Sequence, residues 1–173
     1  RCTPLLPMYL FIGTGYGVPA AWLLERYPQA AVQGVEPAPE RVRVATMALG
    51  ERARVVEGRA PYVPAVERPA ELATMIDMIH YLADDAAAET LRRVRERMRP
   101  GGRLLVRAAL EPHRRLPWSW WLQNLALRMT GVPAHYRSTS HLAGLVAGAG
   151  LQVERTHPSG SDGELVWLVA RKP

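Results

Sequence analysis

The sequence is poor in cysteine, phenylalanine and lysine, each of which occurs only once. A single cysteine, Cys2, excludes an internal disulfide bond and any cysteine-rich metal site, so no metal is expected and a reducing cytoplasmic location fits. No run approaches the roughly 18 consecutive apolar residues that a membrane span requires. The first apolar segment is also too short for a secretory signal.

Size and composition indicate an ordinary globular domain. The 173 residues are 48% hydrophobic and 22% charged, which suits one domain over residues 1–173 with a single sizeable core. The chain begins at Arg1 rather than at a methionine, which leaves room for an upstream segment that this sequence does not contain. No feature indicates an oligomeric state.

The net charge of +6 comes from arginines spread along the chain. Five of them lie within residues 92–99 of an expected helix that has no aromatic residue between them. A nucleic-acid-binding surface usually interleaves aromatic side chains with its basic ones. We therefore interpret this run as a solvated helix face and expect no nucleic-acid partner, although attraction to anionic surfaces remains an alternative.

Short apolar runs alternate with helix-like segments along the chain, which is typical of a βαβ protein with a parallel sheet. Strands are expected at residues 8–13, 31–36, 54–57, 71–77 and 103–107, with a closing hairpin of 151–155 and 165–169. Helices are expected at residues 19–26, 39–50 and 84–98, with helical character at 118–129 and a last helix from Ser138 or Ser140 to Gly148. We expect Asp84 or Asp85 to cap the helix at 84–98.

The most informative segment is an apolar run that breaks into three alternating glycines, Gly13, Gly15 and Gly17. Glycines after a strand allow the backbone to turn sharply and approach a ligand. Glu36 ends the next apolar run, at the spacing expected for an acid that binds the hydroxyls of a ribose. The dinucleotide pattern would need its third glycine where Val18 stands. The segment therefore predicts a pocket for another nucleoside-bearing cofactor.

With its strand order, this glycine pattern resembles the class I S-adenosylmethionine-dependent methyltransferases. The segment Arg99–Val106 is similar to the family's proline-glycine-glycine turn into the fifth strand, and Ile76–Leu82 to the segment that follows the fourth. The resemblance covers nearly the whole chain. It implies an α/β, three-layer Rossmann-like sandwich around a mostly parallel seven-stranded sheet with an antiparallel C-terminal strand.

The resemblance also implies a set of residues that bind S-adenosylmethionine. The glycines would hold its methionine part, Glu36 its ribose, and Pro37 would lie near the adenine. The full set is Gly13, Thr14, Gly15, Gly17, Glu36, Pro37, Arg59, Ala60, Ile76 and Asp77. Two positions differ from the family pattern, because Phe11 and Arg59 stand where acids are expected. They motivate an alternative, a non-catalytic relative that binds the cofactor or a partner.

Methyl transfer from a sulfonium needs alignment more than a particular catalytic group. His80 and Tyr81, which follow the fourth strand, are the candidates for a base and for an acceptor contact; the alternative for His80 is a structural role. Residues of about 111–138 form an expected lid or acceptor-binding insertion that contains Trp118, Trp120 and Trp121.

Three interpretations of these tryptophans remain open: packing on the sheet, an apolar acceptor pocket, or peripheral contact with a membrane. The resemblance therefore implies methyl transfer, and we expect a hydrophobic small-molecule or lipid-like acceptor. A nicotinamide dehydrogenase is a further alternative.

Overall fold

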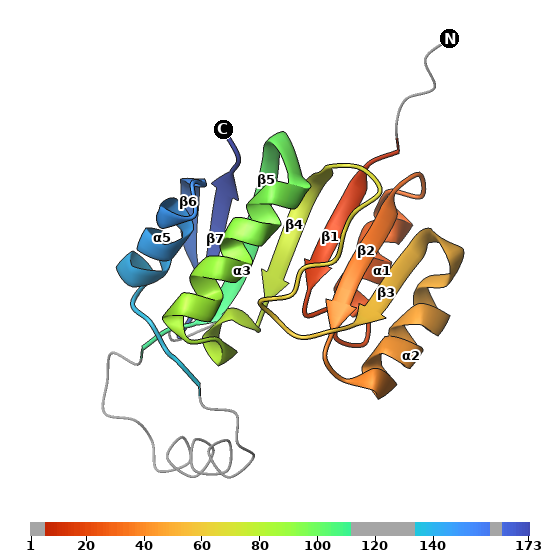
Figure 1. The fold of residues 1–173 in the computed structure, drawn as a ribbon, viewed down its shortest axis with the longest axis horizontal. Helices are drawn as coiled ribbons and strands as arrows, with labels where there is room; N and C mark the ends of the chain where they lie inside the picture. The colour runs from red at the N-terminus through yellow and green to blue at the C-terminus, as the bar shows by residue number, and fades with distance from the viewer. Residues whose placement is uncertain (1–5, 112–133, 160–163) are drawn as a thin grey trace.

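A single twisted sheet of seven strands forms the centre of the molecule (Figure 1). The strands are β1 (Met8–Ile12), β2 (Ala31–Glu36), β3 (Ala53–Glu57), β4 (Ala70–Ile76), β5 (Met98–Ala109), β6 (Gln152–Ser159) and β7 (Leu165–Arg171). Their order is β3-β2-β1-β4-β5-β7-β6; β1 to β5 pair in parallel, and β7 is antiparallel to both neighbours. The computed structural model describes residues 6–111, 134–159 and 164–173. The predicted fold class, with its antiparallel C-terminal strand, is confirmed.

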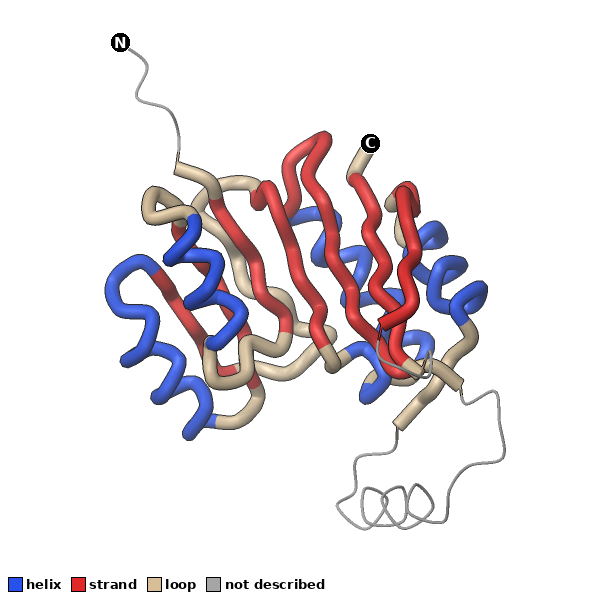
Figure 2. The backbone as a smooth tube through the Cα atoms, turned by 180° about the vertical axis from the view of Figure 1, so that it is seen from behind, coloured by secondary structure: helices blue, strands red, loops and turns tan. Residues whose placement is uncertain are grey.

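Helices cover both faces of the sheet. They are α1 (Val18–Arg26), α2 (Pro39–Leu49), α3 (Asp84–Arg97) and α5 (Thr139–Gly148), with the short 3₁₀ turns η1 (Gly50–Arg52) and η2 (Ile79–Tyr81). Helices α1 and α2 lie on the face turned to the viewer in Figure 2, and α3 and α5 lie on the other. The three layers of the prediction are therefore present.

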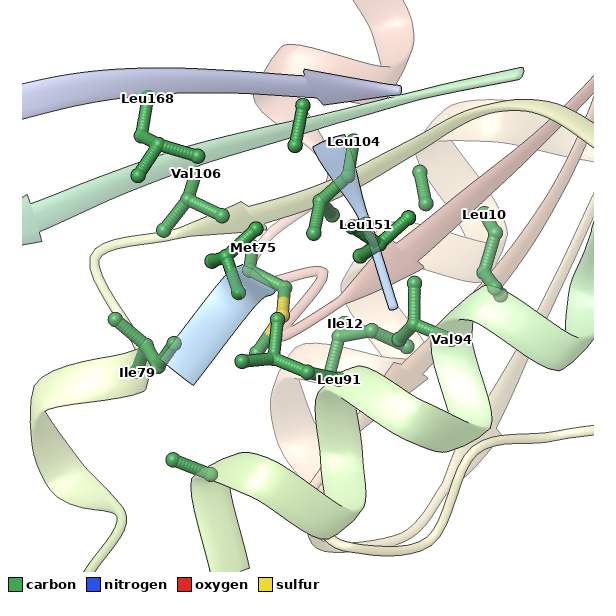
Figure 3. Close-up of a cluster of buried hydrophobic side chains, with 14 of the residues drawn as sticks. Leu10, Ile12, Met75, Ile79, Leu91, Val94, Leu104, Val106, Leu151 and Leu168 are labelled. Carbon is green, nitrogen blue, oxygen red and sulfur yellow. The ribbon is translucent and has the colours of Figure 1, made fainter. Parts of the chain in front are cut away.

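Successive side chains of β1 point to opposite faces of the sheet, so the hydrophobic core consists of two clusters. Leu10 and Ile12 of β1 point toward α3, where they join Met75, Leu91 and Val94 in the larger cluster (Figure 3). The intervening residues of β1 point toward α1 and α2 and form a second cluster. Because both faces of β1 are covered, its sequence is a continuous apolar run, as is usual for a buried parallel strand.

Several element ends differ from the sequence expectations. Strand β5 begins at Met98, so the proline-glycine-glycine segment is part of the strand rather than a turn before it. Gly101 there has a φ of 77°, and the pairing register with β4 shifts between Ala70 and Leu72. Ala83, not an aspartate, occupies the N-cap of α3, and both expected caps fall in its first turn. The register shift depends on the neighbouring strand, which sequence periodicity does not include.

Other helix ends follow their sequence signals. Gly50 closes α2 with a φ of 62°, and the side chain of Ser138 caps α5 by accepting a hydrogen bond from His141 N at 3.2 Å. The expected hairpin of β6 and β7 is also present, with Ser159 opposite Leu165. No helix within the described ranges is long and apolar enough to cross a membrane.

The strand order reverses next to β1. The chain proceeds from β1 through β2 to β3 on one side, then returns to place β4 against the other side of β1. Loops that leave β1 and β4 therefore diverge at the carboxyl edge of the sheet. Open α/β sheets bind their ligands in the crevice that forms at such a reversal.

Candidate functional site

The glycine turn after β1 has the backbone geometry that its sequence predicts. Gly13, Gly15 and Gly17 have φ values of 78°, 59° and 86°, in the left-handed region that side chains rarely adopt. A Cβ at Gly13 would approach Met78, and one at Gly17 would approach Ala45, both at 3.2 Å. A Cβ at Gly15 would have no atom of the described chain within 4 Å, because this residue borders open space.

Glu36, at the end of β2, points into the glycine turn. Its side chain is only 3% exposed, and its Oε2 accepts a hydrogen bond from Gly15 N at 2.9 Å. The other oxygen, Oε1, accepts from Ala38 N at 3.2 Å and lies 3.6 Å from the Arg41 guanidinium. Arg41 also lies over the ring of Tyr16, 5.4 Å from its centroid. The acid and the glycines, separate in sequence, therefore form one structure.

A cavity of about 700 Å³ opens beside this turn along the carboxyl edge of the sheet. It extends from the ends of β2 and β3, across β1, to the end of β4 and the first turn of α3. Its lining residues are Ile12, Gly13, Gly15, Val35, Glu36, Pro37, Arg41, Gly58, Arg59, Ala60, Ile76, Asp77, Met78, Tyr81, Leu82, Ala83 and Ala86. Its volume lies within the range of small-molecule and cofactor sites.

Most residues that the sequence pointed to border this cavity. The structure brings together Gly13, Gly15, Glu36, Pro37, Arg59, Ala60, Ile76, Asp77 and Tyr81. Thr14, Gly17 and His80 are not among the lining residues. Thr14 is buried, and its Oγ1 donates to Val35 O at 3.3 Å; Gly17 packs against α2 instead.

Asp77 is held by its neighbour on β5 rather than free in the cavity. Both carboxylate oxygens accept hydrogen bonds from the Arg107 guanidinium, with a distance of 2.8 Å between Oδ1 and Nε. This hydrogen bonding raises the pKa of Arg107, whose guanidinium also lies over the ring of Trp167. Asp77 has a φ of 53°, an uncommon value for a residue with a side chain. The strand end therefore presents a carboxylate with a fixed orientation.

His80 lies behind the cavity wall. Its side chain is 8% exposed; its ring lies 4.4 Å from that of Tyr81 and is nearly parallel to that of Tyr136, 6.2 Å away. Burial lowers the pKa of His80, Arg137 lowers it further, and Asp77 opposes this effect. This direction of the pKa favours the neutral imidazole at pH 7. Tyr81 is the member of the candidate pair that lines the cavity.

The two departures from the family pattern have different structural consequences. Phe11 is 2% exposed and belongs to the cluster under α1 and α2, so its side chain faces away from the cavity. Arg59, in contrast, lines the cavity beyond β3. The cavity therefore lacks an acid at the second position only.

Sequence reasoning did not single out Arg41 on α2, nor Ala83 and Ala86 at the start of α3, which also line the cavity. These residues belong to no motif in the sequence. The expected tryptophans and most of the insertion at about 111–138 lie outside the described residues.

Among the described residues, no group of three or more His, Cys, Asp or Glu could hold a metal ion.

Comparison with known proteins identifies the family of this chain. A model of the methyltransferase domain matches residues 10–102, which include the glycine turn, Glu36 and the ends of β3 and β4. No curated protein sequence matches the chain.

Solved structures share the fold over almost the whole chain. The mitomycin 7-O-methyltransferase MmcR is 27% identical, with a TM-score of 0.76 over 97% of this chain and 49% of its own. Human N-acetylserotonin methyltransferase, solved in complex with SAM (S-adenosylmethionine), is 24% identical, with a TM-score of 0.70 over 97% of this chain and 48% of its own.

An O-methyltransferase family 2 protein from Planctomyces limnophilus, solved with apigenin, is 20% identical, with a TM-score of 0.77 over 100% of this chain and 53% of its own. The chain thus spans about half the length of these proteins. By its domain match, its strand order and its glycine turn, the chain belongs to the class I S-adenosylmethionine-dependent methyltransferase family.

Proposed function

We propose that this protein transfers the methyl group of S-adenosylmethionine to a hydrophobic small-molecule or lipid-like acceptor. The observation that carries the proposal is the buried carboxylate of Glu36, which meets the glycine turn at the border of a cofactor-sized cavity. The family match supports the donor. The solved relative with apigenin, and one that acts on mitomycin, support a small organic acceptor.

The residues present fit the cofactor. Among the described residues, the buried carboxylate of Glu36 accepts hydrogen bonds from two N–H groups, those of Gly15 and Ala38, and so keeps lone pairs for two ribose hydroxyls. Open space next to Gly15 allows a ligand to approach the backbone closely. Pro37 and Ala60 supply apolar surface where the adenine would lie. Thr14 and Gly17 would then support the turn from behind rather than contact the ligand.

The other end of the cavity suits the methionine arm and an apolar acceptor. Ile76, Met78 and Leu82 provide apolar surface, and Tyr81 adds a ring with a polar hydroxyl. Asp77, fixed by Arg107, offers a carboxylate for the amino group of the methionine arm. The apolar surface at this end supports an acceptor that is largely hydrophobic.

When bound, S-adenosylmethionine supplies an activated methyl group on a positively charged sulfur. The chain's own task is then to exclude water and to align the acceptor. In this proposal Tyr81 contacts the acceptor. His80, neutral at pH 7, is the candidate base, and it acts if the acceptor must lose a proton and the Tyr81 side chain gives it access.

Calorimetric titration with S-adenosylhomocysteine, the demethylated product, tests the cofactor site. We expect a dissociation constant in the micromolar range, and heat changes indistinguishable from buffer at millimolar ligand would contradict the proposal. Turnover is tested with radiolabelled S-adenosylmethionine and a panel of phenols, heterocyclic amines and lipid headgroup analogues. Binding without any turnover would favour the non-catalytic alternative that Arg59 motivates.

A further inference from the structure

Arg137 is the most completely buried charged side chain near the candidate site that the proposed mechanism does not use. It lies just before α5, and its side chain is 5% exposed. Its guanidinium donates to Asp84 Oδ1 at 2.8 Å and to the carbonyl oxygens of Leu82 at 2.6 Å, Ile79 at 3.1 Å and His135 at 3.2 Å. One side chain therefore satisfies four acceptors from three separate segments.

These acceptors surround the turn that carries the two candidate catalytic residues. Ile79 precedes His80, and Leu82 follows Tyr81, so Arg137 binds the backbone on both sides of the pair. The carbonyl of His80 itself accepts a hydrogen bond from His135 N at 2.6 Å. The cavity face of the turn, formed by Tyr81 and Leu82, is thus fixed from behind by the segment that precedes α5.

The backbone of Arg137 makes a second connection, to the end of β5. Leu110 and Arg137 form a parallel bridge, and Glu111 N donates to Arg137 O at 3.0 Å. Arg137 therefore joins three parts of the fold: the turn behind the cavity, the start of α3 through Asp84, and the strand end from which the insertion leaves.

Only arginine suits this position. A planar guanidinium has five N–H donors in a fixed arrangement, whereas a lysine ammonium is a compact group with three donors. Asp84 provides the compensating charge, and this hydrogen bond lowers the pKa of its carboxyl group. Asp84 itself is 55% exposed and also lies 3.0 Å from His141 Nε2.

We propose that Arg137 is a positioning residue of the active site, which sets the orientation of His80 and Tyr81 at the cavity wall and couples it to the end of β5. This inference rests on the proposed methyl transfer. It assigns Arg137 no contact with cofactor or acceptor.

The test compares Arg137→Lys with Arg92→Lys, an exposed arginine of α3 that pairs with Glu89 and Glu96. We expect the exchange of the His135 amide proton to accelerate about tenfold or more in the first variant. The NMR titration of the His80 imidazole should shift toward its ordinary pKa as the turn loosens. Affinity for S-adenosylhomocysteine should change by less than about twofold, because Glu36 and the glycine turn do not contact Arg137.

Asp84→Asn provides a second variant if Arg137→Lys fails to fold. Asp84 is half exposed, and the amide of the variant removes the compensating charge but keeps one oxygen acceptor, while the carbonyl contacts of Arg137 remain. The same shifts in His135 exchange and His80 titration are expected, with smaller size. If a variant loses stability while the His80 titration stays as in the wild type, Arg137 has only a structural role and the inference is wrong. Failure of the wild type to bind S-adenosylhomocysteine would instead contradict the proposed function.

Discussion

The carboxylate of Glu36 accepts a hydrogen bond from the backbone of Gly15 at 2.9 Å, which joins the end of β2 to the turn after β1. This contact gives Glu36 two tasks. It stabilises a turn built from left-handed glycines, and it places a buried negative charge where a ribose would lie. The site is thus organised by a charged hydrogen bond before any ligand arrives.

Glu36→Gln should weaken cofactor binding strongly. The amide keeps the size of the side chain but replaces one acceptor oxygen by a donor and removes the charge. Hydrogen bonds to charged groups contribute about 1.5–3 kcal/mol, so the dissociation constant of S-adenosylhomocysteine should rise about 10- to 100-fold by calorimetry. Glu57→Gln is the matched control, since Glu57 pairs with Glu36 on the next strand and is exposed. Equal affinities of the two variants would contradict the assignment.

Gly34→Ala should reveal the packing between β2 and the glycine turn. An added Cβ would lie 2.3 Å from Thr14 Oγ1, so we expect a loss of about 1–3 kcal/mol in the free energy of unfolding. Thr14→Ala removes the obstructing atoms, and the double variant should recover about 1 kcal/mol or more relative to the sum of the single ones. Urea denaturation of all four proteins measures this coupling, and strict additivity would show that the two residues do not compete for space.

Arg59→Asp should strengthen cofactor binding. The resemblance places an acid at this position to accept the adenine amino group, and Arg59 lines the cavity. One gained hydrogen bond of about 0.5–1.5 kcal/mol corresponds to about 2- to 10-fold tighter binding of S-adenosylhomocysteine. Arg54→Asp, on the exposed side of β3, makes the same change in net charge and should have little effect. Weaker binding by the Arg59→Asp variant would indicate that the arginine itself contacts the ligand.

Phe11→Asp should not restore the other family acid but should disrupt the fold. Phe11 is 2% exposed and packs among apolar side chains that include those of α1 and α2, where burial of an ionised carboxylate is costly. We expect a loss of at least about 4 kcal/mol in unfolding free energy, compared with less than about 1.5 kcal/mol for Phe11→Leu. Chemical denaturation of both variants gives the comparison, and a stable Phe11→Asp protein would refute this assignment of the side chain to the core.

Stability should decrease as the pH falls from about 7 to 5, partly because of His80. Burial holds the pKa of His80 below 6.5, so in this range the unfolded chain binds a proton that the folded protein does not. Unfolding therefore becomes more favourable at lower pH, until the folded imidazole is protonated too. His80→Gln should show a smaller decrease in urea midpoint between these pH values than the wild type. His157→Gln, which changes an exposed histidine, should retain the wild-type decrease.

The sequence predicted the glycine turn and the place of Glu36 beside it because these signals are local. Three left-handed positions favour glycine, and Glu36 ends the strand next to β1. The family match also decides against the dehydrogenase alternative that Val18 already disfavoured. The roles of these residues in binding remain predictions.

The rest of the site depends on contacts that spacing does not encode. His80 is a candidate base in the sequence, but the 3₁₀ turn leaves Tyr81 to line the cavity and packs His80 against Tyr136. Arg137 went unnoticed because its acceptors are backbone carbonyls, which any sequence provides. Arg137 makes these contacts only because the chain returns to the end of β5, where Arg137 forms a bridge with Leu110.

The bridge between Leu110 and Arg137 joins the two described segments that flank residues 112–133. Glu111 N also donates to Arg137 O at 3.0 Å, so this junction is made by backbone groups. A change of the Arg137 side chain should therefore detach the turn at Ile79–Leu82 while the two segments stay joined.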